Sequence, residues 1–382
     1  MANMYSLKHK HILLLISFIS LGTFFVKGQV VNTATLDTTD IESNGKFKIN
    51  GFIDTYYAWD DNEPNEKDIP YFNSSQRHNE FSINLAYIDF NYSSSKIRAR
   101  FVPSFGSFMN ANYATETGTL KDLLEARVGV KLSEKKEIWI DAGVLGSPFT
   151  NENAVSKDQL MYTRSLACEF VPYYLSGVRL SVPISKKTNF YAYVINGWQQ
   201  IVDLNHDKSL AIQFETRPNN NWLLNWNVYA GNHQTIYYPN HRMRYFSDVY
   251  AIYAPAKSKL NMSACLYAGM QEIKDSITGV LKNVFWSQAN ITARYFVAKN
   301  WSISGRLKAF IDNDEAEVIS ITNEKGFNTF SHTLGLNYHV NKNAMFRIEQ
   351  RSIYADKYIF EATKNRITNT SNYIVGSLAV WF

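Results

Sequence analysis

From residue 46 to residue 382, hydrophobic and polar residues alternate with a period of two. In the stretch 123–132, leucine, alanine and valine occupy the even positions, and Glu125, Arg127 and Lys131 lie between them. Such alternation is typical of strands that have one apolar and one polar face. It predicts sixteen strands, near residues 46–59, 79–92, 96–105, 123–132, 136–145, 173–184, 188–197, 208–217, 221–231, 244–254, 258–270, 283–297, 300–311, 328–340, 343–354 and 371–382.

The connections between these strands alternate strictly between tight polar turns and longer polar segments. Turns such as 93–95, 133–135 and 185–187 are tight, whereas 146–172 is the longest connection. An even number of strands, with short turns on one side and long loops on the other, is the topology of outer-membrane barrels. A soluble β-sandwich has no reason to segregate its connections in this way. We therefore expect an all-β fold: a transmembrane antiparallel barrel with short periplasmic turns and long extracellular loops.

The second predicted strand contains an irregularity, because its apolar phase changes between Leu85 and Ile88. A β-bulge near Ala86 or Tyr87 would restore the alternation.

The composition distinguishes a membrane barrel from a soluble sheet, which would show the same alternation. The chain contains 24 Tyr, 24 Phe and 8 Trp, and many of these residues fall near strand ends, as in the aromatic girdles of membrane barrels. After the first 26 residues, no apolar stretch approaches the roughly 20 residues that a spanning helix requires. Only closed barrels and helices satisfy every backbone group in lipid, so a membrane location here implies a barrel.

The two ends of the chain carry export signals. Basic residues at 8–11 precede an apolar run at 12–26, which is the order of a secretory signal peptide, and cleavage after Gly28 is predicted. We assign 1–28 to the signal peptide, 29–45 to a flexible periplasmic lead-in and 46–382 to one barrel domain. The final strand ends in Phe382, which resembles the signal that the barrel-assembly machinery recognises. These features predict a location in the cell outer membrane.

Four segments resemble the OmpL-like β-barrel porin family: GFIDTYY at 51–57, GVLGSPFTNE at 143–152, YTRS at 162–165 and PYYLSGVR at 172–179. The resemblance implies a porin-like barrel without a defined substrate. In general porins the third external loop folds into the lumen, and residues 146–172 match it in position and length. Glu152, Lys157, Tyr162 and Arg164 are then candidates for a constriction. The alternative is that they are solvated loop charges, although the family-like motif favours a packed or pore-lining role for Tyr162 and Arg164.

A charge at mid-depth on the lipid face is costly, so the charged face of each strand should line the lumen. The resulting pore-lining candidates are Arg98, Arg100, Arg127, Arg179, Arg306, Lys308, Arg347, Arg351, Glu125 and Asp141. The wider set of inward positions adds Arg217, Arg294, Asp54, Asp89, Glu215, Asp248 and Glu349. Basic residues outnumber acidic ones, and rings of charge select among ions, so a mild preference for anions follows. Pairing across neighbouring strands is the alternative use for these charges.

These features predict a channel for passive diffusion of small hydrophilic solutes or ions, without a cofactor, metal or catalytic residue. Its partners would be outer-membrane lipid, the solutes and further copies of the chain in a homotrimer. A non-transporting adhesin or scaffold is the main alternative. An outer-membrane hydrolase is less favoured, because the histidines at 78, 206, 233, 241, 332 and 339 form no arrangement of nucleophile and base.

Cys168 and Cys265 are expected to be idle thiols. The net charge of +5 is scattered along the chain, which argues against nucleic-acid binding.

Overall fold

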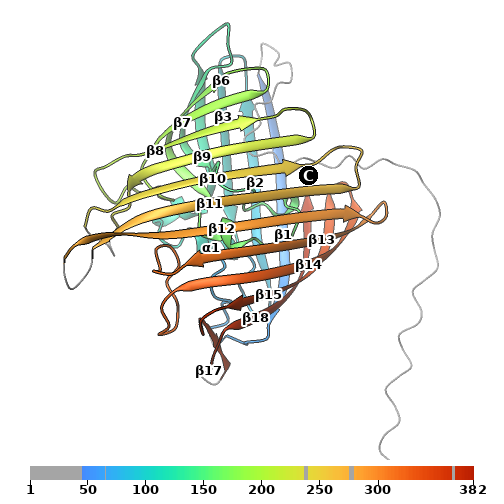
Figure 1. The fold of residues 1–382 in the computed structure, drawn as a ribbon. Coiled ribbons are helices and arrows are strands. Elements are labelled where there is room, and N and C mark those ends of the chain that lie inside the picture. The colour runs from blue at the N-terminus through green and yellow to red at the C-terminus, as the bar shows by residue number, and fades with distance from the viewer. Residues whose placement is uncertain (1–44, 65, 236–239, 275–278, 364–365) are drawn as a thin grey trace, which may run out of the picture.

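The computed structural model describes residues 45–382, apart from 65, 236–239, 275–278 and 364–365. The predicted signal peptide, and all but the last residue of the lead-in, lie outside the described residues. Sixteen antiparallel strands close into a barrel in which β1 pairs with β18 (Figure 1), and the predicted fold class is confirmed. The barrel strands are β1 (Lys46–Asp60), β2 (Glu80–Ser93), β3 (Ile97–Phe105), β4 (Leu123–Lys131), β5 (Trp139–Gly146), β6 (Tyr174–Pro183), β7 (Thr188–Ile195), β8 (Ser209–Thr216), β9 (Trp222–Asn232), β10 (Met243–Tyr253), β11 (Leu260–Lys274), β12 (Leu281–Phe296), β13 (Trp301–Asp312), β14 (Phe327–Asn341), β15 (Ala344–Ala355) and β18 (Thr370–Trp381).

Short elements occupy the long connections. The segment between β3 and β4 holds α1 (Ser107–Asn112) and η1 (Gly118–Asp122). Loop 3, which we define as residues 147–173, holds η2 (Ser156–Asp158) and α2 (Leu166–Glu169). A separate hairpin, β16 (Phe360–Ala362) with β17 (Arg366–Thr368), lies in the last long connection and was not predicted, because three-residue strands are too short for alternation to register. Within the described part of the chain, no helix is long and apolar enough to cross a membrane.

The two faces of each strand differ as the alternation predicts. On β13, Ile303 and Leu307 are exposed on the outer surface, whereas Arg306 and Lys308 point inward and are buried. Placing the charged side chains inside avoids a cost of roughly 2–4 kcal/mol for each Lys or Arg that would otherwise face mid-bilayer lipid. The same alternation over neighbouring strands produces the apolar outer belt.

The predicted irregularity in the second strand is present, but it lies at Asn84 rather than at Ala86 or Tyr87. Asp54 of β1 pairs with Leu85 and the next residue of β1 pairs with Ile83, so Asn84 is the extra residue. Its buried amide donates a hydrogen bond to Asp54 Oδ2 at 3.1 Å and accepts one from a backbone N–H at 2.9 Å. The bulge therefore turns a polar side chain inward, where it finds partners.

Aromatic side chains fill part of the barrel interior between loop 3 and the wall. Phe149 of loop 3 packs against Trp198 and Phe246, with ring centroids 5.9 and 5.3 Å apart. On another side of the barrel, Phe170 of loop 3 packs against Phe310 of β13 at 5.7 Å. Loop 3 thus contacts the wall in two directions, and its core is continuous with that of the barrel.

Candidate functional site

Loop 3 leaves the wall after β5 and is hydrogen-bonded to strands far from its two ends. Asp248 of β10 accepts a hydrogen bond from the backbone N–H of Thr150 at 2.6 Å. Glu349 of β15 accepts hydrogen bonds from the backbone N–H groups of Tyr162 and Thr163 and from the Thr163 hydroxyl. Because β10 and β15 are well separated around the barrel, these bonds carry the loop through the interior.

A buried ion pair fixes the middle of this loop. The guanidinium of Arg306 on β13 lies 2.9 Å from a carboxylate oxygen of Glu152, and both side chains are almost completely buried. Arg306 also donates to the carbonyl oxygen of Thr163 at 2.7 Å, while Glu152 accepts from the backbone N–H of Ser165 at 2.8 Å. The pair therefore joins two segments of loop 3 to one strand.

Two of the constriction candidates are packed inside the loop. Arg164 is 1% exposed and donates to three backbone carbonyl oxygens of loop 3, those of Asn153, Ala154 and Tyr162. The side chain of Tyr162 is also buried, and burial raises the pKa of Tyr162 well above its usual range. Both residues hold the loop in shape, whereas Glu152 and Lys157 contribute to the cavity described next.

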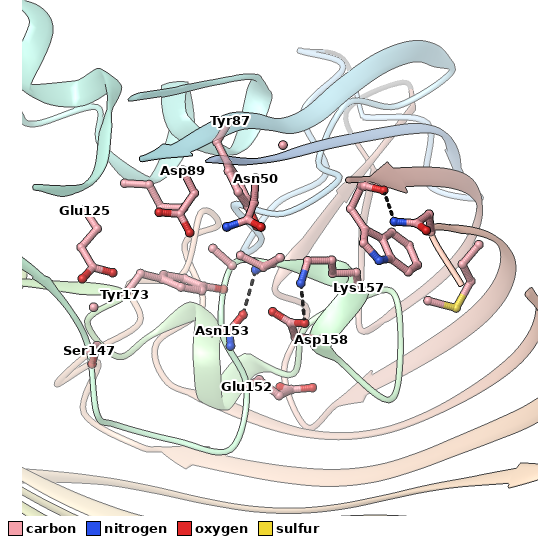
Figure 2. Close-up of a pocket in the computed structure, with 18 of the residues that line it drawn as sticks. Asn50, Tyr87, Asp89, Glu125, Ser147, Glu152, Asn153, Lys157, Asp158 and Tyr173 are labelled. Atoms are coloured by element: carbon pink, nitrogen blue, oxygen red, sulfur yellow. Dashed lines mark hydrogen bonds and ion pairs between the residues drawn. The ribbon is translucent and has the colours of Figure 1, made fainter. Parts of the chain in front are cut away.

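A cavity of about 1340 Å³ lies between loop 3 and the barrel wall and extends to turn residues such as Lys299 and Lys342. Figure 2 shows Asp89 and Glu125 of the wall on one side of this cavity, with Asn153 and Asp158 of loop 3 across from them. We call this space the vestibule. Its lining is rich in charged and amide side chains, so it suits water and hydrophilic solutes.

Six of the pore-lining candidates form one charged network on β3–β6. The carboxylate of Asp141 accepts hydrogen bonds from Arg98 at 2.5 Å, from Arg179 at 3.0 Å and from Arg127 at 3.2 Å. Glu125 accepts from Arg100 at 2.6 Å and from Arg127. Arg100, Glu125, Arg127 and Arg179 also line the vestibule. Cross-strand pairing and exposure to the lumen, which the sequence left as alternatives, occur together here.

The other four pore-lining candidates point inward but are covered by loops. Arg306 holds loop 3, and Arg347 donates to the carbonyl oxygen of Gln159 in the same loop at 3.2 Å. The guanidinium of Arg351 lies 3.6 Å from the ring centroid of Phe72, and the ammonium of Lys308 lies 5.1 Å from the same centroid. Whether these inward residues reach the lumen depends on the path of the loops. The alternation along a strand does not predict that path.

Several residues that shape the site gave no sequence signal. Phe72 covers the two cations, and it lies in an irregular segment, residues 61–79, which we call loop 1. Glu116 accepts hydrogen bonds from the Tyr174 hydroxyl at 2.7 Å and from the backbone N–H of Ile201 at 2.8 Å, which ties two further loops together. These contacts join segments far apart in sequence, so only the structure could identify them.

Alternative chemistry finds little support in the described residues. They contain no group of three or more His, Cys, Asp or Glu side chains arranged to hold a metal ion. His241 lies 3.9 Å from Asp207, and both side chains are exposed. Cys168 and Cys265 are both free and buried, and burial raises the pKa of the Cys168 thiol, which disfavours the reactive thiolate.

The sequence comparison assigns the family. Residues 46–382, the whole barrel, match the family described as "Putative beta-barrel porin-2, OmpL-like". The chain belongs to the OmpL-like β-barrel porin family. No curated protein is detectably similar in sequence. The family match confirms the resemblance seen at residues 51–57 and 143–179. A porin of this family is a barrel of the outer membrane.

Solved structures share the fold of this OmpL-like porin at low sequence identity. The outer membrane channel DcaP of Acinetobacter baumannii aligns with a TM-score of 0.61 at 11% identity, covering 88% of this chain and 97% of that chain. An anion-selective porin from Comamonas acidovorans aligns with a TM-score of 0.57 at 9% identity, covering 88% and 100%. The trimer form of OmpT, an outer membrane protein of Vibrio cholerae, aligns with a TM-score of 0.56 at 10% identity, covering 88% and 99%.

Proposed function

We propose that this OmpL-like porin is a channel for the passive diffusion of small hydrophilic solutes, with no covalent step and no cofactor. The observation that carries the proposal is the charged vestibule between loop 3 and the wall of β2–β6. A sixteen-stranded barrel is wide enough to hold an aqueous path, even after one loop enters it. The solutes would pass along the Arg100 and Glu125 face, opposite Asn153 and Asp158.

A mild preference for anions belongs to the same proposal. Seven Lys or Arg side chains and four Asp or Glu side chains line the vestibule. Most of these charges are paired, so the excess should bias ion flow without creating a strict filter. The pore-lining arginines predicted from the sequence therefore have two roles in this channel. Arg100, Arg127 and Arg179 face the solute, and Arg347 and Arg351 position the loops.

Export and assembly complete the proposal. The basic and apolar segments at 8–11 and 12–26 would direct the chain across the inner membrane, and the aromatic end at Phe382 would present it to the barrel-assembly machinery. Outer-membrane lipid would then contact the apolar outer belt.

We also propose a homotrimer, with the outer face of β2–β5 as the contact between copies. Strands β3, β4 and β5 have 9, 9 and 8 residues, whereas β11 and β12 have 15 and 16. The short side carries an apolar groove of about 440 Å³ between stacked Phe rings and small alanines. A short wall with a groove suits a second copy better than lipid of full thickness. Chemical cross-linking of the detergent-folded protein tests this: a ladder ending at three copies supports it, and a monomer contradicts it.

A scaffold or adhesin is the second candidate, and the packing of the loops favours it. Tyr71 of loop 1 packs edge-on against Phe327 and Phe360, with ring centroids 4.7 and 5.8 Å apart, which joins loop 1 to the first residue of β14 and to the hairpin of β16. Such packing suits a rigid surface for contact with other molecules. Swelling of liposomes that contain the refolded protein separates the two candidates: uptake of small sugars supports the channel, and intact liposomes with correctly folded protein support the scaffold.

A further inference from the structure

The lining of the vestibule is divided into two parts with different charge balance. The part formed by β2–β6 and loop 3 contains four acidic side chains and four basic ones, and most of them are paired. The part formed by β11–β15 and their turns contains Arg294, Lys299, Lys342 and His339. Among the described residues that line this second part, none has an acidic side chain. We call it the basic sector.

Arg294 of β12 is the central group of the basic sector. It is 6% exposed, and its Nε and Nη2 atoms donate to the carbonyl oxygens of Gln159 and Leu160 at 2.6–3.1 Å. Its Nη1 atom has no hydrogen-bond partner among the described residues, although the side chain lines the vestibule. The guanidinium is therefore held in place by loop 3 and keeps one donor group available.

A second guanidinium reinforces the positive charge. Arg347 of β15 donates from Nη2 to the same Gln159 carbonyl oxygen, at 3.2 Å, so two cations converge on one uncharged acceptor. The Nη1 atom of Arg347 and the Nε2 atom of His339 are both buried without a partner in the described structure. His339 stacks beside Phe296, with ring centroids 5.5 Å apart, and both rings line the vestibule.

The two neighbouring carboxylates do not pair with these arginines. Glu349 lies on the same face of β15 as Arg347, but both of its oxygens accept hydrogen bonds from loop 3. Asp54 lies within electrostatic reach of Arg347; its Oδ2 atom accepts a hydrogen bond from Asn84 at 3.1 Å, and its buried Oδ1 atom has no partner among the described residues. Neither carboxylate forms an ion pair with Arg294 or Arg347 in the described residues. Buried cations normally have a charged partner, so this pair calls for one that comes from solution.

We propose that the basic sector binds a small oxyanion, with Arg294 as the main ligand and His339 and Lys342 beside it. A guanidinium with a free N–H edge matches the geometry of phosphate or carboxylate oxygens and forms short, charge-assisted hydrogen bonds with them. The amide side chains of Asn341 and Asn343, which line the same part of the vestibule, add further donors. This inference deepens the proposed function by placing an anion-binding station on the solute path, but binding itself does not require conduction.

The test uses the full mature barrel, folded in detergent, and titrates it with inorganic phosphate in a calorimeter at low ionic strength, where screening is weak. We expect saturable binding with one site per barrel. Arg294→Gln should weaken it by about tenfold or more, because a charge-assisted hydrogen bond is lost while the glutamine amide still reaches loop 3. Arg294→Lys, which retains the charge, should weaken binding less than Arg294→Gln does.

The matched controls use lysines in turns and loops, where we expect a substitution to leave the barrel folded. Lys342→Gln removes one charge from the basic sector and should weaken phosphate binding. Lys157→Gln removes one charge from the paired sector of the same vestibule and should leave binding unchanged. Absence of saturable binding to the folded barrel would overturn the proposal, as would equal losses for Lys342→Gln and Lys157→Gln. Phosphate binding by a barrel that does not conduct would instead contradict the channel and leave this site standing.

Discussion

On β3–β6, the luminal arginines are neutralised by carboxylates of neighbouring strands, and Asp141 alone accepts hydrogen bonds from three of them. On β12–β15, three of the four luminal arginines, Arg294, Arg306 and Arg347, donate to the backbone of loop 3. Arginines point inward from both walls, and both walls border the vestibule. The arginines of β3–β6 are nevertheless held by carboxylates, whereas those of β12–β15 are held mainly by loop 3. The partner that each guanidinium finds, rather than its place in the alternation, determines its role.

This comparison has a physical basis in burial. The side chain of Arg100 is 31% exposed, so the vestibule can hydrate its charge, whereas that of Arg306 is fully buried. A charge that water can reach tolerates the loss of a partner, but a buried charge does not. Substitutions in the two walls should therefore have effects of different size.

The largest effect is expected for Arg306→Met. It removes the buried guanidinium from the Thr163 carbonyl oxygen and from the Glu152 carboxylate, which keeps only uncharged donors from Ser165. The free energy of unfolding should therefore fall by about 3–5 kcal/mol. Urea unfolding of the barrel in lipid vesicles, followed by tryptophan fluorescence, measures this. The matched variant Arg100→Met should cost less, about 1–2 kcal/mol, because Glu125 retains Arg127 and because Asp89, which loses its ion pair with Arg100, borders the hydrated vestibule. Equal losses for the two variants would contradict the distinction between the walls.

A smaller effect on stability, but a clear one on ion flow, is expected for Asp141→Asn. The substitution keeps the shape of the side chain and removes the one charge shared by Arg98, Arg127 and Arg179. We expect a loss of about 2 kcal/mol in the free energy of unfolding. In a salt gradient, the reversal potential should also shift toward the equilibrium potential of the anion. An unchanged reversal potential in a folded, conducting variant would show that this network does not border the ion path.

The next effect concerns the dependence of stability on pH. Glu169 of loop 3 is buried and accepts a hydrogen bond from the backbone N–H of Asn73 in loop 1 at 2.9 Å, and burial raises the pKa of Glu169. The folded state then binds the proton more readily than the unfolded chain, so this carboxyl group lowers stability as the pH rises through its folded pKa. In Glu169→Gln that loss should disappear. Urea midpoints measured between about pH 4 and pH 8 test this, and parallel pH profiles for the two proteins would refute it.

The smallest effect is expected at a turn. Lys96 and Glu134 form an ion pair of 3.4 Å with side-chain exposures of 74% and 86%. Exposed pairs of this kind contribute little because water and salt screen them. Lys96→Gln should leave both the urea midpoint and the conductance unchanged. A marked change in either would mean that periplasmic turns influence the lumen more than burial suggests.

The barrel could be predicted from the sequence because a single rule, period two, governs most of its strands; the second strand breaks it at the bulge. The alternation places Arg306 inside and Leu307 outside without any knowledge of partners. The fifth strand starts at Trp139 rather than at residue 136, because the turn before it extends to Ile138. The backbone N–H of Leu132 donates a hydrogen bond to the carbonyl oxygen of Ile138 and closes this turn. Errors of this size arise where polar turn residues happen to continue the alternation.

The site could be predicted only in part. Cross-strand pairing on β3–β6 follows from register, so the charges of Glu125 and Asp141 could be placed in the lumen from the sequence. The path of loop 3 could not, because it depends on contacts such as Glu349 with Thr163, nearly two hundred residues apart. Burial of Arg164 follows from that path. Sequence alternation describes the wall of a barrel, and it does not describe what the loops place inside it.

The channel function is decided by the single-channel conductance of the refolded mature protein in a planar bilayer, with the reversal potential under a potassium chloride gradient. We expect discrete open steps and a reversal potential biased toward chloride, because the vestibule is hydrated and carries more basic than acidic side chains. A correctly folded barrel that stays silent would contradict the channel. Open steps with a bias toward potassium would contradict the charge balance assigned to the vestibule.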